Sequence, residues 1–157
     1  MLADNDQQLI DAVRRAYSAA AERPKGKHPF PVGKGFAKSL GYPKKLLARL
    51  PSVSVEGFAG VSNVATAAEI PAGSRVLDLG CGAGLDSLIA AEKTGPDGRV
   101  IGIDFSSAML DRARRAAEEA GIKNVQFLQA EGGNLPLEDG SIDVALVNGL
   151  FNLNPKR

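Results

Sequence analysis

The chain has 157 residues, with 44% hydrophobic and 24% charged residues, one cysteine and a net charge of +1. This composition is typical of one globular domain, and no apolar run approaches the roughly 18 residues that a membrane-spanning helix needs. The polar N-terminus does not resemble a signal peptide, and a lone cysteine excludes a disulfide within the chain, so we expect a cytoplasmic protein. The small net charge gives no reason to expect a nucleic-acid partner.

The first 70 residues predict a helical segment. Apolar residues at helical spacing indicate an amphipathic helix over 6–21, and a loop rich in proline and glycine follows over 22–35. This loop contains His28, which has no second histidine or cysteine nearby to complete a metal site. A short helix is expected over 43–50, and one or two short helices, broken around Gly60, over 52–68.

Charge is unevenly distributed along this segment. Between Arg23 and Leu50 there are eight lysine or arginine residues and no acid. Such a stretch is either a solvated surface or a surface that attracts an acidic substrate, and the sequence leaves both interpretations open.

Residues 71–157 predict alternating strands and helices. Short apolar runs indicate strands over 75–79, 99–103, 125–129 and 142–147, and helices are expected over 85–93 and from Ser106 to about Ala120. Strands separated by helices demand right-handed crossovers and a parallel sheet. We therefore predict an α/β fold with a Rossmann-like, incomplete sheet of about four strands and an N-terminal helical segment.

The first strand ends in Gly80-x-Gly82-x-Gly84, and a helix follows at once. Strand, glycine loop and helix form the first part of a nucleotide-binding βαβ unit, in which glycines let a ligand approach the backbone. Asp78 before the loop, and Leu85 where a dinucleotide pattern needs glycine, count against NAD or FAD. Both suit a cationic ligand such as the ammonium and sulfonium of S-adenosylmethionine. Asp104 ends the second strand, where an acid can accept hydrogen bonds from ribose hydroxyls.

Three stretches resemble the motifs of class I S-adenosylmethionine-dependent methyltransferases: VLDLGCGAG, VIGIDFS and LQAEGGNLP. The resemblance implies that S-adenosylmethionine lies against the glycine loop. The cofactor-binding residues that it implies are Asp78, Gly80, Cys81, Gly82, Gly84, Asp104, Phe105, Met109, Glu131, Gly132 and Asn148. Asp78 would face the amino group, Asp104 the ribose, Phe105 or Met109 the adenine ring, and Glu131 and Gly132 the adenine edge. The alternative for the two strand-end acids is helix capping or solvent exposure.

The resemblance is strongest to an arsenite-methyltransferase-like group. In that group, segments similar to Gly57–Asn63 cover the cofactor, which makes Phe58, Gly60 and Asn63 candidate lining residues. Phe58 could equally be a core residue. The stretch from Asn148 to Asn154 resembles the loop where acceptor and methyl group meet. Those enzymes have a cysteine in this loop, but here Gly149 or its neighbours replace it. Because As(III) prefers several thiolates, arsenite is disfavoured as the acceptor.

We therefore predict a methyltransferase that transfers a methyl group from S-adenosylmethionine to a small molecule, with no catalytic residue identified. The alternatives are a non-catalytic S-adenosylmethionine-binding module and, less favoured, an NAD-dependent oxidoreductase. The family sheet has seven strands and only four are found, so we expect a truncated product. An exposed fourth-strand edge would then favour self-association as a dimer. The organisation expected is a cofactor-covering segment over 1–70 and a partial cofactor-binding core over 71–157.

Overall fold

The computed structural model describes residues 4–131 and 133–149. A four-stranded parallel sheet forms its centre, with strands in the order β3-β2-β1-β4. The strands are β1 (Arg75–Leu79), β2 (Arg99–Asp104), β3 (Val125–Gln129) and β4 (Val144–Val147). The predicted α/β class, the parallel sheet and all four strands are confirmed, although β4 begins two residues later than expected.

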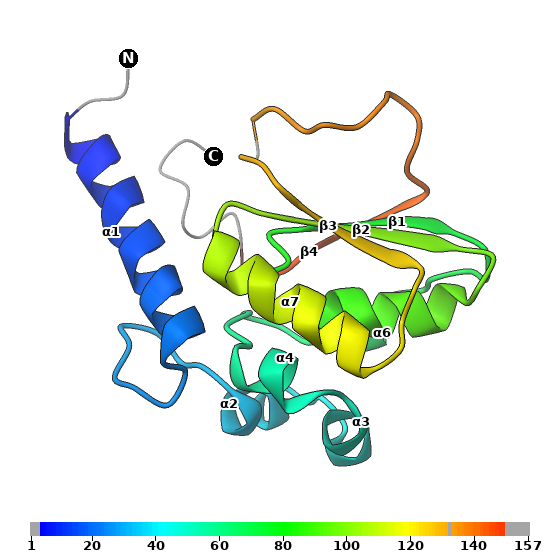
Figure 1. Cartoon of the computed structure of the whole chain (residues 1–157), viewed down its shortest axis with the longest axis horizontal. Helices are drawn as coiled ribbons and strands as arrows, with labels where there is room; N and C mark the ends of the chain where they lie inside the picture. Colours follow the sequence, from blue (N-terminus) through cyan, green and yellow to red (C-terminus); the bar gives the residue numbers. More distant parts are fainter. Residues whose placement is uncertain (1–3, 132, 150–157) are drawn as a thin grey trace.

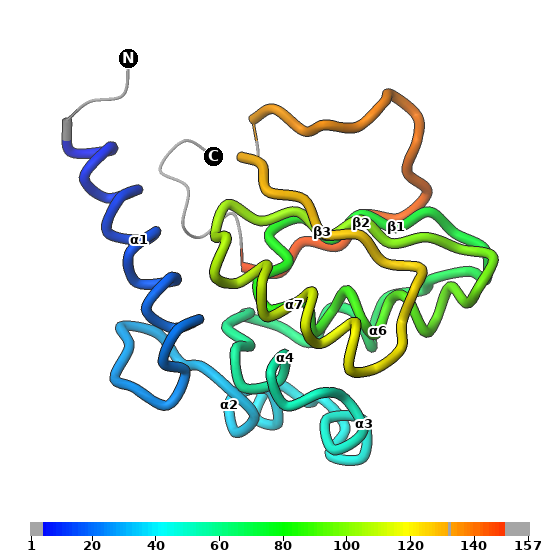
Figure 2. The backbone as a smooth tube through the Cα atoms, in the orientation of Figure 1, coloured from blue at the N-terminus to red at the C-terminus, as the bar shows by residue number. Residues whose placement is uncertain are grey.

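Two helices, α6 (Leu85–Thr94) and α7 (Ser107–Glu119), cover one face of the sheet (Figure 1). Alternate strand residues point toward them, and Val76, Val100, Phe127 and Leu146 join a core with α6 and α7 residues. The predicted cap is confirmed, because the Ser106 side chain accepts a hydrogen bond from the Met109 N–H at the start of α7. Residues 133–143, which lead into β4, run on the opposite side of the sheet (Figure 2).

The N-terminal segment folds into five helices within the described residues. They are α1 (Asp4–Glu22), α2 (Lys34–Ser39), α3 (Lys44–Arg49), α4 (Ser52–Glu56) and α5 (Val64–Ala67). The helix over 6–21, the helix over 43–50 and the pair broken around Gly60 are confirmed. Helix α2 was not predicted, because glycines at 33 and 35 indicate a loop; Ala37, which is fully buried, shows that packing stabilises it instead.

Helices α2 to α5 share one hydrophobic core with the sheet, whereas Ala20 and Ala21 of α1 belong to a second buried cluster with Ala83 and Met109. Ala37, Tyr42 and Leu47 belong to the same buried cluster as Val76 and Leu88. Helices α1 and α4 both pack on α7, which brings the N-terminal segment to the carboxyl end of the strands. The division at residue 70 stays a prediction. None of the helices in the described part of the chain is long and apolar enough to cross a membrane.

Candidate functional site

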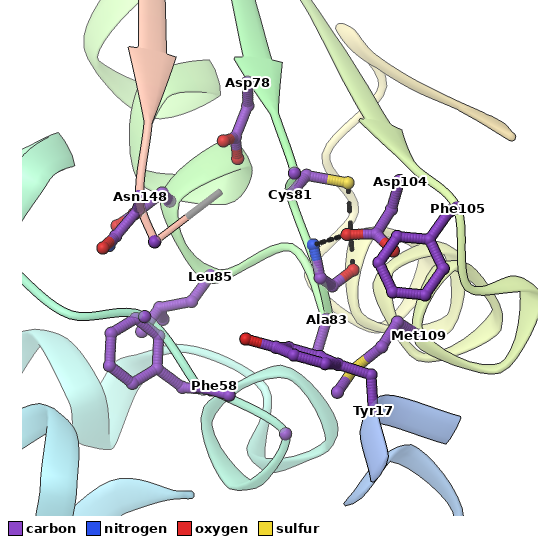
Figure 3. A pocket seen from close by; sticks show the side chains of 17 residues that line it. Tyr17, Phe58, Asp78, Cys81, Ala83, Leu85, Asp104, Phe105, Met109 and Asn148 are labelled. Atoms are coloured by element: carbon purple, nitrogen blue, oxygen red, sulfur yellow. Dashed lines mark hydrogen bonds between the residues drawn. The ribbon is translucent and has the colours of Figure 1, made fainter. Parts of the chain in front are cut away.

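A pocket lies at the carboxyl ends of β1 and β2, between the glycine loop and the N-terminal segment (Figure 3). The backbone N–H groups of Gly80 and Cys81 both donate to the Ile103 carbonyl, at 2.7 and 2.9 Å, which fixes the loop against the end of β2. Most of the cofactor-binding residues expected from the sequence meet here. Those in the lining are Asp78, Gly80, Cys81, Gly82, Asp104, Phe105, Met109 and Asn148.

Two of the expected residues, Gly84 and Glu131, do not line the pocket. Gly84 instead supports packing: it has a φ of +84°, and a Cβ there would lie 2.8 Å from the Cβ of Ala113. Glu131 lies outside the lining, with its side chain 72% exposed and ion-paired to Arg14 of α1. Gly132, and the stretch from Leu150 to Asn154, lie outside the described residues.

The segment over 57–63, which we call the cover loop, contributes its first four residues to the pocket lining. Phe58 and Gly60 line the pocket as expected, and so do their neighbours Gly57 and Ala59. Phe58 is also 6% exposed and joins the core, so both interpretations of this residue hold. Asn63 does not line the pocket: it stands before α5, where its side chain accepts a hydrogen bond from Thr66.

Tyr17 of α1 is the main lining residue that the sequence does not identify. Its ring stacks on Phe30 with centroids 4.6 Å apart and meets Phe105 edge-on at 6.0 Å. Burial, and then the charge of Asp104, raise the pKa of Tyr17 to about 12, so the hydroxyl stays neutral. Helical spacing places Tyr17 on the inner face of α1, but no local pattern connects that face with a loop more than sixty residues away.

Asp78 lies in the pocket wall with only 1% of its surface exposed. The Ser87 hydroxyl donates to its carboxylate at 2.6 Å. Burial, followed by the charge of Asp86, raises its pKa to about 8. A carboxyl group in this state favours a cation beside it, because a positive charge offsets the cost of its ionisation.

Asp104 joins the glycine loop to helix α7. One carboxylate oxygen accepts from the Gly82 N–H and the other from the Ser106 N–H, both at 2.8 Å. Burial raises its pKa, and these backbone hydrogen bonds oppose that shift. Each oxygen retains a second lone pair, so the group can still accept a hydrogen bond from a ligand hydroxyl.

Cys81 is buried, and its thiol donates to the Gly82 carbonyl at 3.8 Å. Burial, and then the charges of Asp78 and Asp104, raise the pKa of this thiol well above 9. The neutral thiol is a poor nucleophile and a poor metal ligand. Among the described residues, no group of three His, Cys, Asp or Glu side chains could hold a metal ion.

The pocket therefore combines acids with exposed backbone and aromatic rings. Its described lining holds three buried acids, Asp78, Asp86 and Asp104, and no lysine, arginine or histidine. Such a lining favours a ligand with positive charge near the glycine loop. The rings of Tyr17 and Phe105 can contact a flat, apolar group beside Asp104 (Figure 3).

A parallel sheet with a glycine-loop pocket at the carboxyl ends of its strands is the architecture of a nucleotide-binding α/β protein. A sequence model described as a methyltransferase domain matches residues 70–157, which is more than half of the chain. The chain belongs to this methyltransferase domain family, whose cofactor is S-adenosylmethionine. The resemblance to class I methyltransferases is thereby confirmed.

Similar proteins extend the likeness into the N-terminal segment. An arsenite methyltransferase from Halobacterium salinarum is 37% identical over 121 residues, which cover 77% of this chain and 31% of that protein. A demethylmenaquinone methyltransferase from Lactococcus lactis is 44% identical over 81 residues, covering 51% of this chain and 32% of that protein. The chain thus spans about a third of the length of these curated relatives.

A solved structure shows the same arrangement in three dimensions. An arsenic(III) S-adenosylmethionine methyltransferase from Chlamydomonas reinhardtii superposes with a TM-score of 0.63 and 34% sequence identity. The match covers 71% of this chain and 40% of that one.

Proposed function

We propose that this chain binds S-adenosylmethionine in the pocket and forms the cofactor half of a methyltransferase for a small-molecule acceptor. The observation that carries the proposal is the pocket itself, where a glycine loop meets three buried acids and no described basic side chain. The ammonium and sulfonium of S-adenosylmethionine supply the positive charge that such a site favours. The residues present therefore fit this cofactor.

Each expected contact follows from where a side chain lies. Asp78 would accept from the ammonium group, and the backbone at Gly80 and Gly82 would lie along the methionine part. Asp104 would accept from the ribose, and Phe105, Met109 and Tyr17 would contact the adenine. Gly84 and Glu131 are not proposed as contacts.

S-adenosylmethionine supplies an activated methyl group when bound. The chain's own contribution is to bind, to orient and to exclude water, and holding two reactants in line is worth up to about 7–11 kcal/mol in favourable cases. Asp86 and Asp104 are each occupied by hydrogen bonds, which favours a structural or binding role over that of a general base. No residue is assigned a catalytic role.

We propose a small organic acceptor rather than arsenite. Relatives are named as methyltransferases of arsenite and of demethylmenaquinone. The one thiol of this chain, Cys81, is buried and neutral, whereas As(III) prefers several thiolates. A cytoplasmic setting and the absence of a nucleic-acid partner remain proposals that rest on the single cysteine and the net charge of +1.

Ligand selectivity tests the proposed function. We expect S-adenosylmethionine and S-adenosylhomocysteine to raise the melting temperature of the purified chain and NAD⁺ to leave it unchanged, because only a ligand bound to the native state stabilises it. Stabilisation by NAD⁺ and not by S-adenosylmethionine would support the oxidoreductase alternative and contradict the proposal.

A further inference from the structure

A buried polar cluster joins three separate segments beside the pocket. Its centre is Asp86, in the first turn of α6, which is 5% exposed. One carboxylate oxygen accepts from the Tyr42 hydroxyl at 2.5 Å, and the other accepts from the Asn148 side-chain N–H at 2.8 Å. Tyr42 comes from the N-terminal segment and Asn148 directly follows β4, so one carboxylate connects both to the cofactor helix.

Asn148 in turn holds the cover loop. Its side-chain oxygen accepts from the backbone N–H groups of Val61 and Ser62, at 2.8 and 3.1 Å. Its side-chain N–H also donates to the Ser62 carbonyl at 2.7 Å. Apolar packing contributes less to this end of the loop, because Val61 is 49% exposed. Hydrogen bonds to one amide therefore hold residues 61 and 62 against the end of β4.

Gly60 makes the close approach possible. A Cβ at this position would lie 2.6–2.8 Å from the amide atoms of Asn148, which is closer than real Cβ contacts allow. The amide thus occupies space that any larger residue at 60 would fill. Figure 3 shows Asn148 at the end of its strand, at the edge of the pocket.

The orientation of the Asn148 amide depends on Asp86. Both oxygens of Asp86 act as acceptors here, one from the Tyr42 hydroxyl and one from Asn148, so the NH₂ group of Asn148 faces Asp86 and its oxygen faces the cover loop. Asp86 therefore supports the two loop hydrogen bonds without touching either backbone N–H, together with the Ser62 carbonyl, which accepts from the same NH₂ group. An amide at residue 86 would offer one acceptor oxygen where the carboxylate offers two, so it could not accept from both Tyr42 and Asn148 in this geometry, and the support of the Asn148 amide would weaken.

We propose that Asp86 is a positioning residue that keeps the cover loop closed over the glycine loop by orienting the amide of Asn148. Only the identity of the covered ligand rests on the proposed function. Closure itself is a property of the free protein, so it can be tested without any cofactor.

Amide hydrogen exchange, followed by NMR on the free 157-residue protein, tests the proposal. In Asp86→Asn we expect the Val61 and Ser62 amides to exchange about tenfold faster, since the hydrogen bond of each is weakened. Amides in β1 and β2 should keep their wild-type rates. The matched control is Glu92→Gln, the same change at an acid on the same helix that pairs with Arg49 at the surface.

Tyr42→Phe provides a milder second variant. It removes the hydroxyl donor but keeps the ring, whose centroid lies 5.1 Å from that of Phe58. We expect the same two amides to exchange faster, by a smaller factor than in Asp86→Asn. Unchanged Val61 and Ser62 exchange in both variants, or equal acceleration throughout the sheet, would overturn the proposal. Failure of the protein to bind S-adenosylmethionine would overturn the proposed function, but it would not affect the exchange rates measured on the free protein or the role of Asp86 inferred from them.

Discussion

Asp78 combines almost complete burial with a position in the pocket wall. Its pKa is raised to about 8, so below that pH a cationic ligand must displace a proton before it pairs with the carboxylate. We expect affinity for S-adenosylmethionine to increase as pH rises from 6 to 8 and to level off above. Calorimetry in buffers of different ionisation enthalpy would measure the released proton, and affinity that falls over this range would contradict the assignment.

The raised pKa of Asp78 also affects the stability of the free protein. Because the pKa of Asp78 is higher in the folded state than in the unfolded state, the native state holds the proton more tightly. This proton binding stabilises the fold below about pH 4, and the stabilisation is lost as pH rises from about 4 to about 8. We expect the free protein to lose unfolding free energy between pH 5 and pH 8, and Asp78→Asn to lose less. Denaturant unfolding at both pH values checks this expectation, and parallel pH dependence in the two proteins would count against it.

Gly82 and Gly84 both have positive φ, at +53° and +84°, but their surroundings differ. A Cβ at 84 would lie 2.8 Å from Ala113 and 3.2 Å from the Phe127 ring, whereas nothing lies within 4 Å of one at 82. We expect Gly82→Ala to cost about 1–2 kcal/mol of stability from backbone strain. Gly84→Ala should cost about 1–3 kcal/mol more from overpacking. Urea unfolding measures both, and equal losses would refute the packing role of Gly84.

At the scale of elements, Arg112 of α7 holds the N-terminal helices in place. Its guanidinium donates to the carbonyl of Ala21, near the end of α1, and to that of Val53 in α4, the latter at 2.9 Å. We expect Arg112→Ala to lower the unfolding free energy by about 2 kcal/mol, since a half-buried charged donor that makes two hydrogen bonds is lost. Arg115→Ala, an exposed arginine on the same helix, is the control for thermal unfolding. A similar loss in both variants would show that Arg112 has no special role.

The elements that the sequence predicts well depend on short-range patterns. Strand β1, the glycine loop and the Ser106 cap are each encoded within a few residues, and the structure contains all three. Helix α2 and the contacts of Tyr17 depend instead on packing between distant segments, which no local spacing reveals. The ion pair of Glu131 with Arg14 is likewise invisible in sequence, because 117 positions separate its partners.

At the scale of the whole molecule, self-association remains a proposal. Within the described residues β4 pairs only with β1, and its Ala145 is exposed. An unpaired strand edge can add a strand from another chain. We expect light scattering at micromolar concentration to give the mass of a dimer, and a proline at Ala145 to shift it toward the monomer. A monomer at all concentrations would exclude this proposal.

The central claim is that the pocket beside the glycine loop binds S-adenosylmethionine. Titration calorimetry on three folded proteins tests it most directly: the wild type, Asp104→Ala inside the pocket and Glu131→Ala outside it. Since hydrogen bonds to a charged group are worth about 1.5–3 kcal/mol, Asp104→Ala should bind at least about tenfold more weakly. Glu131→Ala should match the wild type. A folded wild-type protein that shows no binding, or equal affinity in all three proteins, would contradict the claim.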